Sequence, residues 1–183
     1  MTHSVAVVVG SASQDSLNRR LARALQLAAP ESLEFIEAEI ADLPFYRPEF
    51  DADYPEIGVR LKQVVEEADA LLFVTPEYNR SIPAVLKNSL EWLSRPKGTS
   101  ALSGKPAMMA GATPGGVGTA VAQAQLRSVL THLDVRLLGQ PELYVQISKQ
   151  QFDDEGRATR EGTQDFLATA MRAFADHIGA VLA

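Results

Sequence analysis

The chain has 183 residues, of which 46% are hydrophobic and 22% charged, a composition that is ordinary for a globular protein. Its 17 basic and 23 acidic residues give a net charge of -6, so we expect neither nucleic acid nor an anionic membrane as a partner. There is no cysteine and no apolar run of membrane-spanning length, so we expect a cytoplasmic protein without disulfides or thiolate chemistry.

The first part of the chain alternates short apolar runs with apolar residues at helical spacing. Val5–Val9 is a β-branched run, typical of a strand that is buried on both faces. Leucine and alanine then recur every three or four residues from Leu17 until Pro30, which indicates a helix. The segment 41–55 contains three prolines and is interpreted as a loop. The predicted strands of this part are 5–9, 33–40 and 70–74, and the predicted helices are 17–28 and 57–68.

The second part of the chain continues the alternation. A helix is predicted to begin near Pro83, and the segment that follows the fourth strand is rich in glycine. The last strand is expected within 135–147, where Gly139 and Pro141 interrupt it. The predicted strands of this part are 106–112 and the one within 135–147, and the predicted helices are 85–93, 122–133 and 167–181.

Five strands that alternate with five helices predict one α/β domain, residues 1–183, with a doubly wound parallel sheet and helices on both faces. In such sheets, ligands bind at the carboxyl ends of the strands. This rule draws attention to the segments after strands one, three and four. They are the three most unusual stretches of the sequence.

The segment after the first strand, "GSASQDSLN", is rich in small polar residues. A helix N-terminus presents free backbone N–H groups, and the hydroxyls of Ser11, Ser13 and Ser16 can add donors, so a phosphate could bind there. The alternative is that Asp15 or Ser16 only caps the helix. The loop contains neither G-x-x-x-x-G-K-[ST] nor G-x-G-x-x-G, which disfavours a nucleoside triphosphatase and a dinucleotide-binding fold.

The segments after strands three and four are also polar and stiff. Pro76–Asn79 is expected to form a turn at the edge of the sheet, with backbone N–H groups able to bond a flat heteroaromatic ring. The alternative is a rigid turn with Tyr78 packed locally. Gly115, Gly116 and Gly118 either let the backbone approach a ligand or make a flexible turn.

Together and in this order, the three segments match the motifs of one known family. The pattern G-S-x-R-x-x-S-x-N corresponds to Gly10–Asn18, and P-E-Y-N-x-S-x-P-x-x-L-K-N-x-x-x-W matches Pro76–Trp92 throughout. A glycine-rich segment that leads to Q-x-x-L-R lies at 113–127. Over essentially its whole length, the chain resembles the NADPH-dependent FMN reductases of flavodoxin-like fold, which include bacterial quinone, chromate and azo-dye reductases.

The resemblance implies a flavodoxin-like, five-stranded sheet in the order 2-1-3-4-5, with FMN as cofactor and NADPH or NADH as co-substrate. The first motif would bind the FMN phosphate, the second would flank the isoalloxazine ring, and the third would line the other side of the ring. No side chain is expected to be a catalytic nucleophile or a metal ligand, because the hydride chemistry belongs to FMN. The cofactor-binding residues that the resemblance implies are Ser11, Ser13, Ser16, Leu17, Asn18, Pro76, Glu77, Tyr78, Asn79, Ser81, Thr113 and Gly115.

The chain departs from the first motif at one position. The family's usual arginine, near the FMN phosphate and the nicotinamide nucleotide, is Ser13 here. A serine supplies no charge, so we expect weak discrimination between NADPH and NADH, or slow turnover with both, unless Arg19, Arg20 or an arginine of a partner subunit compensates.

The resemblance also implies an electron acceptor and an assembly. The acceptor would be a small molecule such as a quinone, chromate, an azo compound or free flavin. The chain would form a homodimer or homotetramer through the helix after the second motif, where Arg80, Glu91, Trp92 and Arg95 are candidate interface residues. The alternative for Trp92 is that it belongs to the core.

Three other classes of protein are alternatives to a flavin reductase. A metal site is disfavoured because His3, His132 and His177 lie far apart in the sequence, and a hydrolase is disfavoured because G-x-S-x-G is absent. A non-enzymatic electron carrier of the flavodoxin type, which binds FMN without admitting a nicotinamide, is the remaining alternative. The small residues of 113–118 favour an open site and therefore an enzyme.

Overall fold

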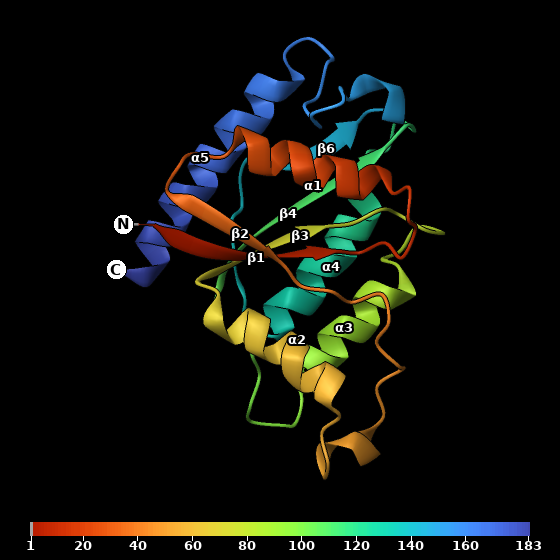
Figure 1. Ribbon diagram of the computed structural model, residues 1–183, viewed down its shortest axis with the longest axis vertical. Helices are drawn as coiled ribbons and strands as arrows, with labels where there is room; N and C mark the ends of the chain where they lie inside the picture. Colours follow the sequence, from red (N-terminus) through yellow and green to blue (C-terminus); the bar gives the residue numbers. More distant parts are fainter. Residues whose placement is uncertain (1) are drawn as a thin grey trace.

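The computed structural model describes residues 2–183, which form an α/β structure around one parallel sheet (Figure 1). The strands follow the order β2-β1-β3-β4-β5, and β6 pairs with β4, so the predicted fold class and strand order are confirmed. The strands are β1 (His3–Val9), β2 (Leu33–Glu37), β3 (Ala70–Val74), β4 (Pro106–Thr113), β5 (Arg136–Leu137) and β6 (Leu143–Gln146). The helices are α1 (Leu17–Ala28), α2 (Glu56–Glu67), α3 (Ala84–Ser94), α4 (Ala120–His132) and α5 (Thr163–Leu182), with the short 3-10 helices η1 (Pro48–Asp51) and η2 (Lys149–Gln151).

The fifth position of the sheet is divided into two short strands. β5 pairs with the beginning of β4, where Ala107 lies opposite Leu137, and β6 pairs with its end, where Ala110 lies opposite Leu143. The break between them contains Gly139 and the cis-proline Pro141. The interruption predicted from the sequence is therefore present. It divides the expected fifth strand into two separate strands, β5 and β6.

Helices cover both faces of the sheet (Figure 1). α1 and α5 pack on one face, against alternate β1 residues such as Val5 and Val7, while α2, α3 and α4 pack on the other, against Ala6 and Val8. β3 lies in the middle of the sheet and is buried along its whole length, which explains its uninterrupted apolar sequence. Within residues 2–183, no helix is both long and apolar enough to cross a membrane.

The segment 41–55 is an irregular excursion beside α2 and α3, and it is organised around Trp92 (Figure 1). Tyr46, Phe50 and Tyr54 contact the Trp92 ring, with centroids 5.8, 5.2 and 5.2 Å away. Trp92 is completely buried and its ring nitrogen donates to the carbonyl of Pro44 at 2.8 Å. Of the two expectations for Trp92, the core residue is confirmed and the interface residue is wrong, because its own chain covers it.

The same segment leaves one aromatic side chain uncovered. Asn88 of α3 accepts a hydrogen bond from the backbone of Tyr46 at 2.9 Å and donates one to the carbonyl of Pro44 at 2.9 Å. Phe45 lies between these two anchored residues, and 79% of its surface is exposed. Asn88 and Trp92 of the second motif thus hold a loop, and that loop presents Phe45 to solvent.

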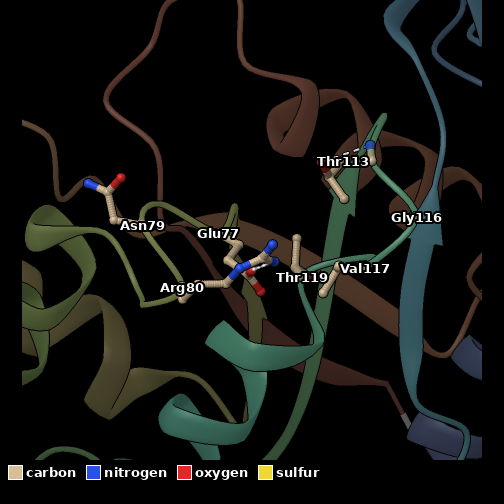
Figure 2. A pocket seen from close by; sticks show the side chains of 8 residues that line it. Glu77, Asn79, Arg80, Thr113, Gly116, Val117 and Thr119 are labelled. Atoms are coloured by element: carbon tan, nitrogen blue, oxygen red, sulfur yellow. Dashed lines mark hydrogen bonds and ion pairs between the residues drawn. The ribbon is translucent and has the colours of Figure 1, made fainter.

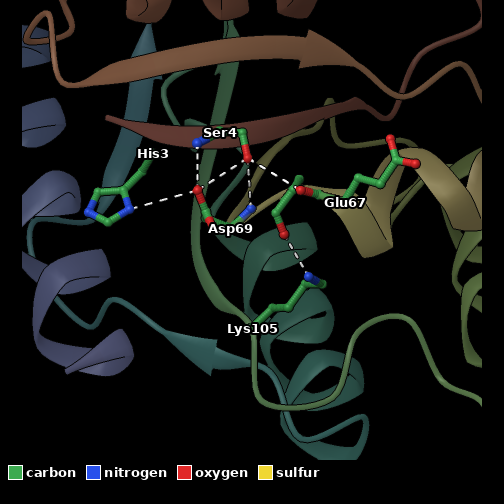
Figure 3. A network of polar contacts seen from close by, with 6 residues as sticks. His3, Ser4, Glu67, Asp69 and Lys105 are labelled. Carbon is green, nitrogen blue, oxygen red and sulfur yellow. Dashed lines mark hydrogen bonds and ion pairs between the residues drawn. The ribbon is translucent and has the colours of Figure 1, made fainter. Parts of the chain in front are cut away.

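The amino ends of the strands are joined by a separate polar network (Figure 3). The Asp69 carboxylate accepts hydrogen bonds from the backbone N–H of Ser4 at 2.8 Å and from its hydroxyl at 3.2 Å. Lys105 donates to the carbonyl of Ala68 at 2.6 Å, and burial lowers the pKa of its amine. These contacts hold β1, β3 and β4 together at the edge of the sheet opposite to the three polar loops.

Candidate functional site

The three polar loops meet at the carboxyl edge of the sheet, as the sequence predicts. They enclose a cavity of about 210 Å³ between the β1–α1 loop, the β3–α3 loop and the end of β4. Nine of the twelve predicted site residues line it: Ser11, Ser13, Ser16, Leu17, Asn18, Pro76, Glu77, Tyr78 and Thr113. Asp15, Ala112 and Pro114 complete the lining.

The β1–α1 loop presents hydrogen-bond donors at the N-terminus of α1. Ser16 caps this helix, because its hydroxyl oxygen accepts from the backbone N–H of Arg19 at 3.3 Å. The hydroxyl oxygen of Ser11 similarly accepts from the backbone N–H of Ser13 at 3.3 Å. Each hydroxyl keeps its own proton to donate, and the N–H groups of Leu17 and Asn18 precede the first intrahelical bond. Capping and anion binding are therefore compatible roles for this loop.

Asn18 has a role that its position in the motif did not reveal. Its side-chain amide nitrogen donates to the carbonyl of Ala112 at 3.0 Å, and its amide oxygen accepts from the N–H of Ala112 at 2.8 Å. The residue is 2% exposed. Asn18 thus joins the start of α1 to the end of β4, where the third loop begins, and only one of its amide protons remains for a ligand.

Asp15, which lines the cavity, binds two cationic side chains. Its carboxylate accepts hydrogen bonds from Lys149 of η2 at 2.6 Å and from Arg20 of α1 at 3.0 Å. These contacts, led by the bond from Lys149, lower the pKa of Asp15. Two cations and one anion leave a net positive charge beside Ser13 and Ser16, which suits an anionic ligand.

The β3–α3 loop contains a tight two-residue turn. Tyr78 and Ser81 exchange backbone hydrogen bonds of 3.0 and 2.9 Å, and the residues between them, Asn79 and Arg80, have φ values of +50° and +64°. Gln125 of α4 braces the turn by donating to the carbonyl of Arg80 at 2.8 Å and accepting from the Ser81 hydroxyl at 2.6 Å. Tyr78 is 51% exposed, so the alternative that its ring packs locally is wrong.

Glu77 connects the second loop to the third. One carboxylate oxygen accepts from the backbone N–H groups of Val121 and Ala122, both at 3.0 Å, and therefore caps the N-terminus of α4. The other oxygen accepts from Arg80 at 2.8 Å. Burial by itself would raise the pKa of Glu77, but the bonds from Ala122 and Arg80 outweigh it and lower the pKa overall.

A larger cavity, of about 510 Å³, adjoins the first on the side of the glycine-rich loop (Figure 2). Glu77 and Thr113 line both cavities, and Asn79 and Gly115 line this one. The Thr113 hydroxyl accepts from the N–H of Gly115 at 3.2 Å and so shapes the start of this loop. Ser81 lines neither cavity, since its hydroxyl faces Gln125.

Sequence reasoning missed several residues of this region. Lys149 joins Asp15 from 134 positions away, and Gln125 braces the second loop from 44 positions beyond Ser81. No spacing rule connects such pairs. The available signal for Gln125 was its place between Gln123 and Arg127, in the segment already singled out after the glycine-rich loop.

Comparison with known proteins agrees with this geometry. The family model described as NADPH-dependent FMN reductase matches residues 3–150. The chain is 45% identical over 175 residues to a 2-hydroxy-1,4-benzoquinone reductase of Burkholderia sp, covering 96% of each chain. It is 42% identical over 177 residues to a quinone reductase of Pseudomonas putida, covering 96% of this chain and 95% of the relative.

A solved structure gives the same result for the fold. FerB, a flavoenzyme NAD(P)H:(acceptor) oxidoreductase from Paracoccus denitrificans, superposes with a TM-score of 0.94 over 98% of both chains, at 42% identity. The motifs, the strand order, the full-length relatives and this superposition all agree, and the chain belongs to the NADPH-dependent FMN reductase family.

Proposed function

We propose that the chain binds one FMN in the smaller cavity and uses NADPH or NADH to reduce a quinone. The observation that carries this proposal is the meeting of the three loops around one cavity at the carboxyl edge of β1, β3 and β4. Family membership and the names of the relatives from Burkholderia and Pseudomonas putida support the reaction class and the acceptor.

The donor set at the start of α1 fits the phosphate of FMN. Ser11 and Ser16 each have a hydroxyl proton to donate, and the N–H groups of Leu17 and Asn18 lie beside them at the positive end of the helix dipole. The charges of Lys149 and Arg20 outweigh that of Asp15 at the same edge. We therefore assign phosphate binding to this loop, with Asn18 also holding the loop to β4.

The second and third loops fit the ring end of the cofactor. Pro76, Glu77 and Tyr78 line one side of the smaller cavity and Thr113 lines the other, so a flat ring would lie between the two loops. When bound, FMN supplies the redox chemistry by accepting a hydride from the nicotinamide and passing electrons to the acceptor. The chain's own contribution is to position these two loops, and Glu77 does so by bonding the N-terminus of α4, directly after the third loop.

The larger cavity favours an enzyme over an electron carrier of the flavodoxin type. An enzyme must admit a nicotinamide nucleotide or an acceptor beside the flavin, whereas a carrier needs no such space. The cavity of about 510 Å³ directly beside the predicted ring position provides that space. Chromate, azo compounds and free flavin remain further candidate acceptors for the same open site.

We also propose that the chain assembles as a homodimer or homotetramer. Phe45 supports this, because the backbone on each side of this exposed ring is anchored to α3 by Asn88 and Trp92. A loop whose backbone is already held in place loses little conformational entropy when its aromatic side chain enters an interface.

The reaction is tested with purified protein and a panel of acceptors. Apo-protein is first titrated with FMN, and oxidation of NADPH and NADH is then followed with a benzoquinone, chromate, an azo dye and free FMN as acceptors. Saturable binding of one FMN per chain and a quinone-dependent rate support the proposal. FMN binding without nicotinamide oxidation would identify an electron carrier instead.

A further inference from the structure

Arg80 occupies a backbone position that would suit glycine better. It is the second residue of the turn between Tyr78 and Ser81, and its φ is +64°. Turns of this kind favour asparagine followed by glycine, because a side chain in the left-handed region is sterically disfavoured. Asn79 follows this preference and Arg80 does not. Strained positions of this kind are frequent at functional sites, where the surroundings hold them in place.

The guanidinium of Arg80 lies at the larger cavity (Figure 2). Of the eight residues that line this cavity, Arg80 and Glu77 are the two charged ones. The Arg80 side chain is 66% exposed, while the Glu77 side chain is 9% exposed. The cation therefore faces the open space, and the anion lies beneath it.

Arg80 can leave Glu77 without leaving that carboxylate unpaired. The second oxygen of Glu77 accepts from the N–H groups of Val121 and Ala122, which offset its charge at the positive end of α4. The guanidinium is on the exposed side of this ion pair, where water screens its attraction to Glu77, so only a modest interaction opposes its transfer to a ligand.

The other arginines near the first loop are engaged elsewhere. Arg19 pairs with Glu37 of β2, and Arg20 pairs with Asp15. Neither lines the larger cavity. Arg80 is thus the cation within this cavity's lining, in a chain that has Ser13 where an arginine was expected.

We propose that Arg80 binds a phosphate group of the nicotinamide nucleotide, either the pyrophosphate or the 2′-phosphate of NADPH. The inference rests on the proposed function, because it assumes that the nucleotide enters the larger cavity to reach FMN in the smaller one. Guanidinium and phosphate form short, charge-assisted and often bidentate hydrogen bonds. Arg80 is therefore a specificity-determining residue for the co-substrate.

Arg80→Gly is the sharpest variant, because glycine relaxes the backbone at φ +64° while it removes the guanidinium. Arg80→Lys keeps a positive charge but lacks the planar guanidinium that can form two parallel hydrogen bonds. Arg60→Ala is the matched control, since Arg60 is 61% exposed and pairs with Glu56 on α2, away from both cavities. For each FMN-loaded protein, kcat/KM is measured with NADPH and with NADH, and the binding of NADP+ and NAD+ is measured by calorimetry.

We expect Arg80→Gly to lower kcat/KM and nucleotide affinity by about tenfold to a hundredfold, the value of a lost hydrogen bond to a charged group. For Arg80→Lys, both quantities should lie between those of Arg80→Gly and those of the unmodified chain. For Arg60→Ala, both should match the unmodified chain. An equal loss with both nucleotides assigns Arg80 to the pyrophosphate, and a loss with NADPH and NADP+ alone assigns it to the 2′-phosphate. Values within about twofold of the unmodified chain for all four nucleotides overturn the proposal.

An FMN titration separates failure of this inference from failure of the proposed function. If the unmodified chain neither binds FMN nor oxidises NADPH or NADH, the proposed function fails and the Arg80 inference fails with it. If the unmodified chain is active and Arg80→Gly retains full rates, only the Arg80 inference fails. If Arg80→Gly loses FMN itself, Arg80 acts in holding the turn and the inference is likewise overturned.

Discussion

Asn18 and Ala112 are joined by a pair of hydrogen bonds, 2.8 and 3.0 Å long, although 94 positions separate them in the sequence. The side chain of Asn18 pairs with both backbone polar groups of Ala112, as a neighbouring strand would. Both residues are buried, so neither backbone group of Ala112 has water to replace the amide. This contact therefore joins the start of α1, after the first loop, to the end of β4, before the third loop.

Asn18→Leu is expected to destabilise the protein by about 2–4 kcal/mol, because it leaves a buried N–H and a buried carbonyl of Ala112 without partners. Asn18→Asp keeps the acceptor, but it places a carboxylate oxygen against the Ala112 carbonyl and buries its charge, so its effect should be at least as large. Urea-induced unfolding of the apo-protein measures both. A change within about 0.5 kcal/mol for Asn18→Leu would show that the contact is unimportant.

The double variant Ser11→Ala with Ser16→Ala is expected to weaken FMN binding at least tenfold and to leave riboflavin binding nearly unchanged. Only FMN carries the phosphate that these hydroxyls are proposed to bind. Fluorescence titration of both flavins against both proteins is the measurement. Riboflavin is the internal control, since a general disturbance of the cavity would weaken both flavins equally.

Glu77→Gln is expected to lower stability at pH 7 by about 1–2 kcal/mol, because the carboxylate charge at the N-terminus of α4 is lost. Since folding lowers the pKa of Glu77, its contribution is fully present above the ordinary value of 4.5 and is lost as the pH falls through the lowered pKa. The two proteins should therefore converge in stability at acidic pH. Thermal unfolding between pH 3 and 8 measures this, and a difference that stays constant with pH would contradict the assignment.

Ser13→Arg is expected to raise the selectivity for NADPH over NADH about tenfold to a hundredfold, since it adds a charged donor for the 2′-phosphate. The selectivity is the ratio of the two kcat/KM values. Ser13→Gln, which adds a neutral donor of similar length, is the control. A natural chain that already prefers NADPH by more than about a hundredfold, with no gain in Ser13→Arg, would show that other cations suffice.

The assembly is tested by light scattering of the purified chain. We expect a mass above that of the 19.8 kDa monomer, and Phe45→Ser should shift it toward the monomer. Phe166→Ser is the matched control, because Phe166 is also an exposed aromatic, 41% exposed on α5. A monomeric mass for the unmodified chain at working concentration would rule out the proposed oligomer.

The sequence by itself determined the order of strands and helices and the three loops that form the candidate site. Strands such as β3 are recognisable because burial on both faces demands an uninterrupted apolar run, and helices because one face is apolar every three or four residues. The carboxyl-edge rule for parallel sheets then places the loops after β1, β3 and β4 together. These are local or topological properties, and a single sequence contains them.

Only the tertiary structure decided what individual side chains do within that frame. Trp92 is buried because segment 41–55 folds over it, and Glu77 caps α4 because β3 and β4 are neighbours in the sheet. Lys149 approaches Asp15 because the chain returns to α1 after β6. Each contact joins residues far apart in sequence, and its energy depends on distance and burial, which the pattern of residue types along the chain does not record.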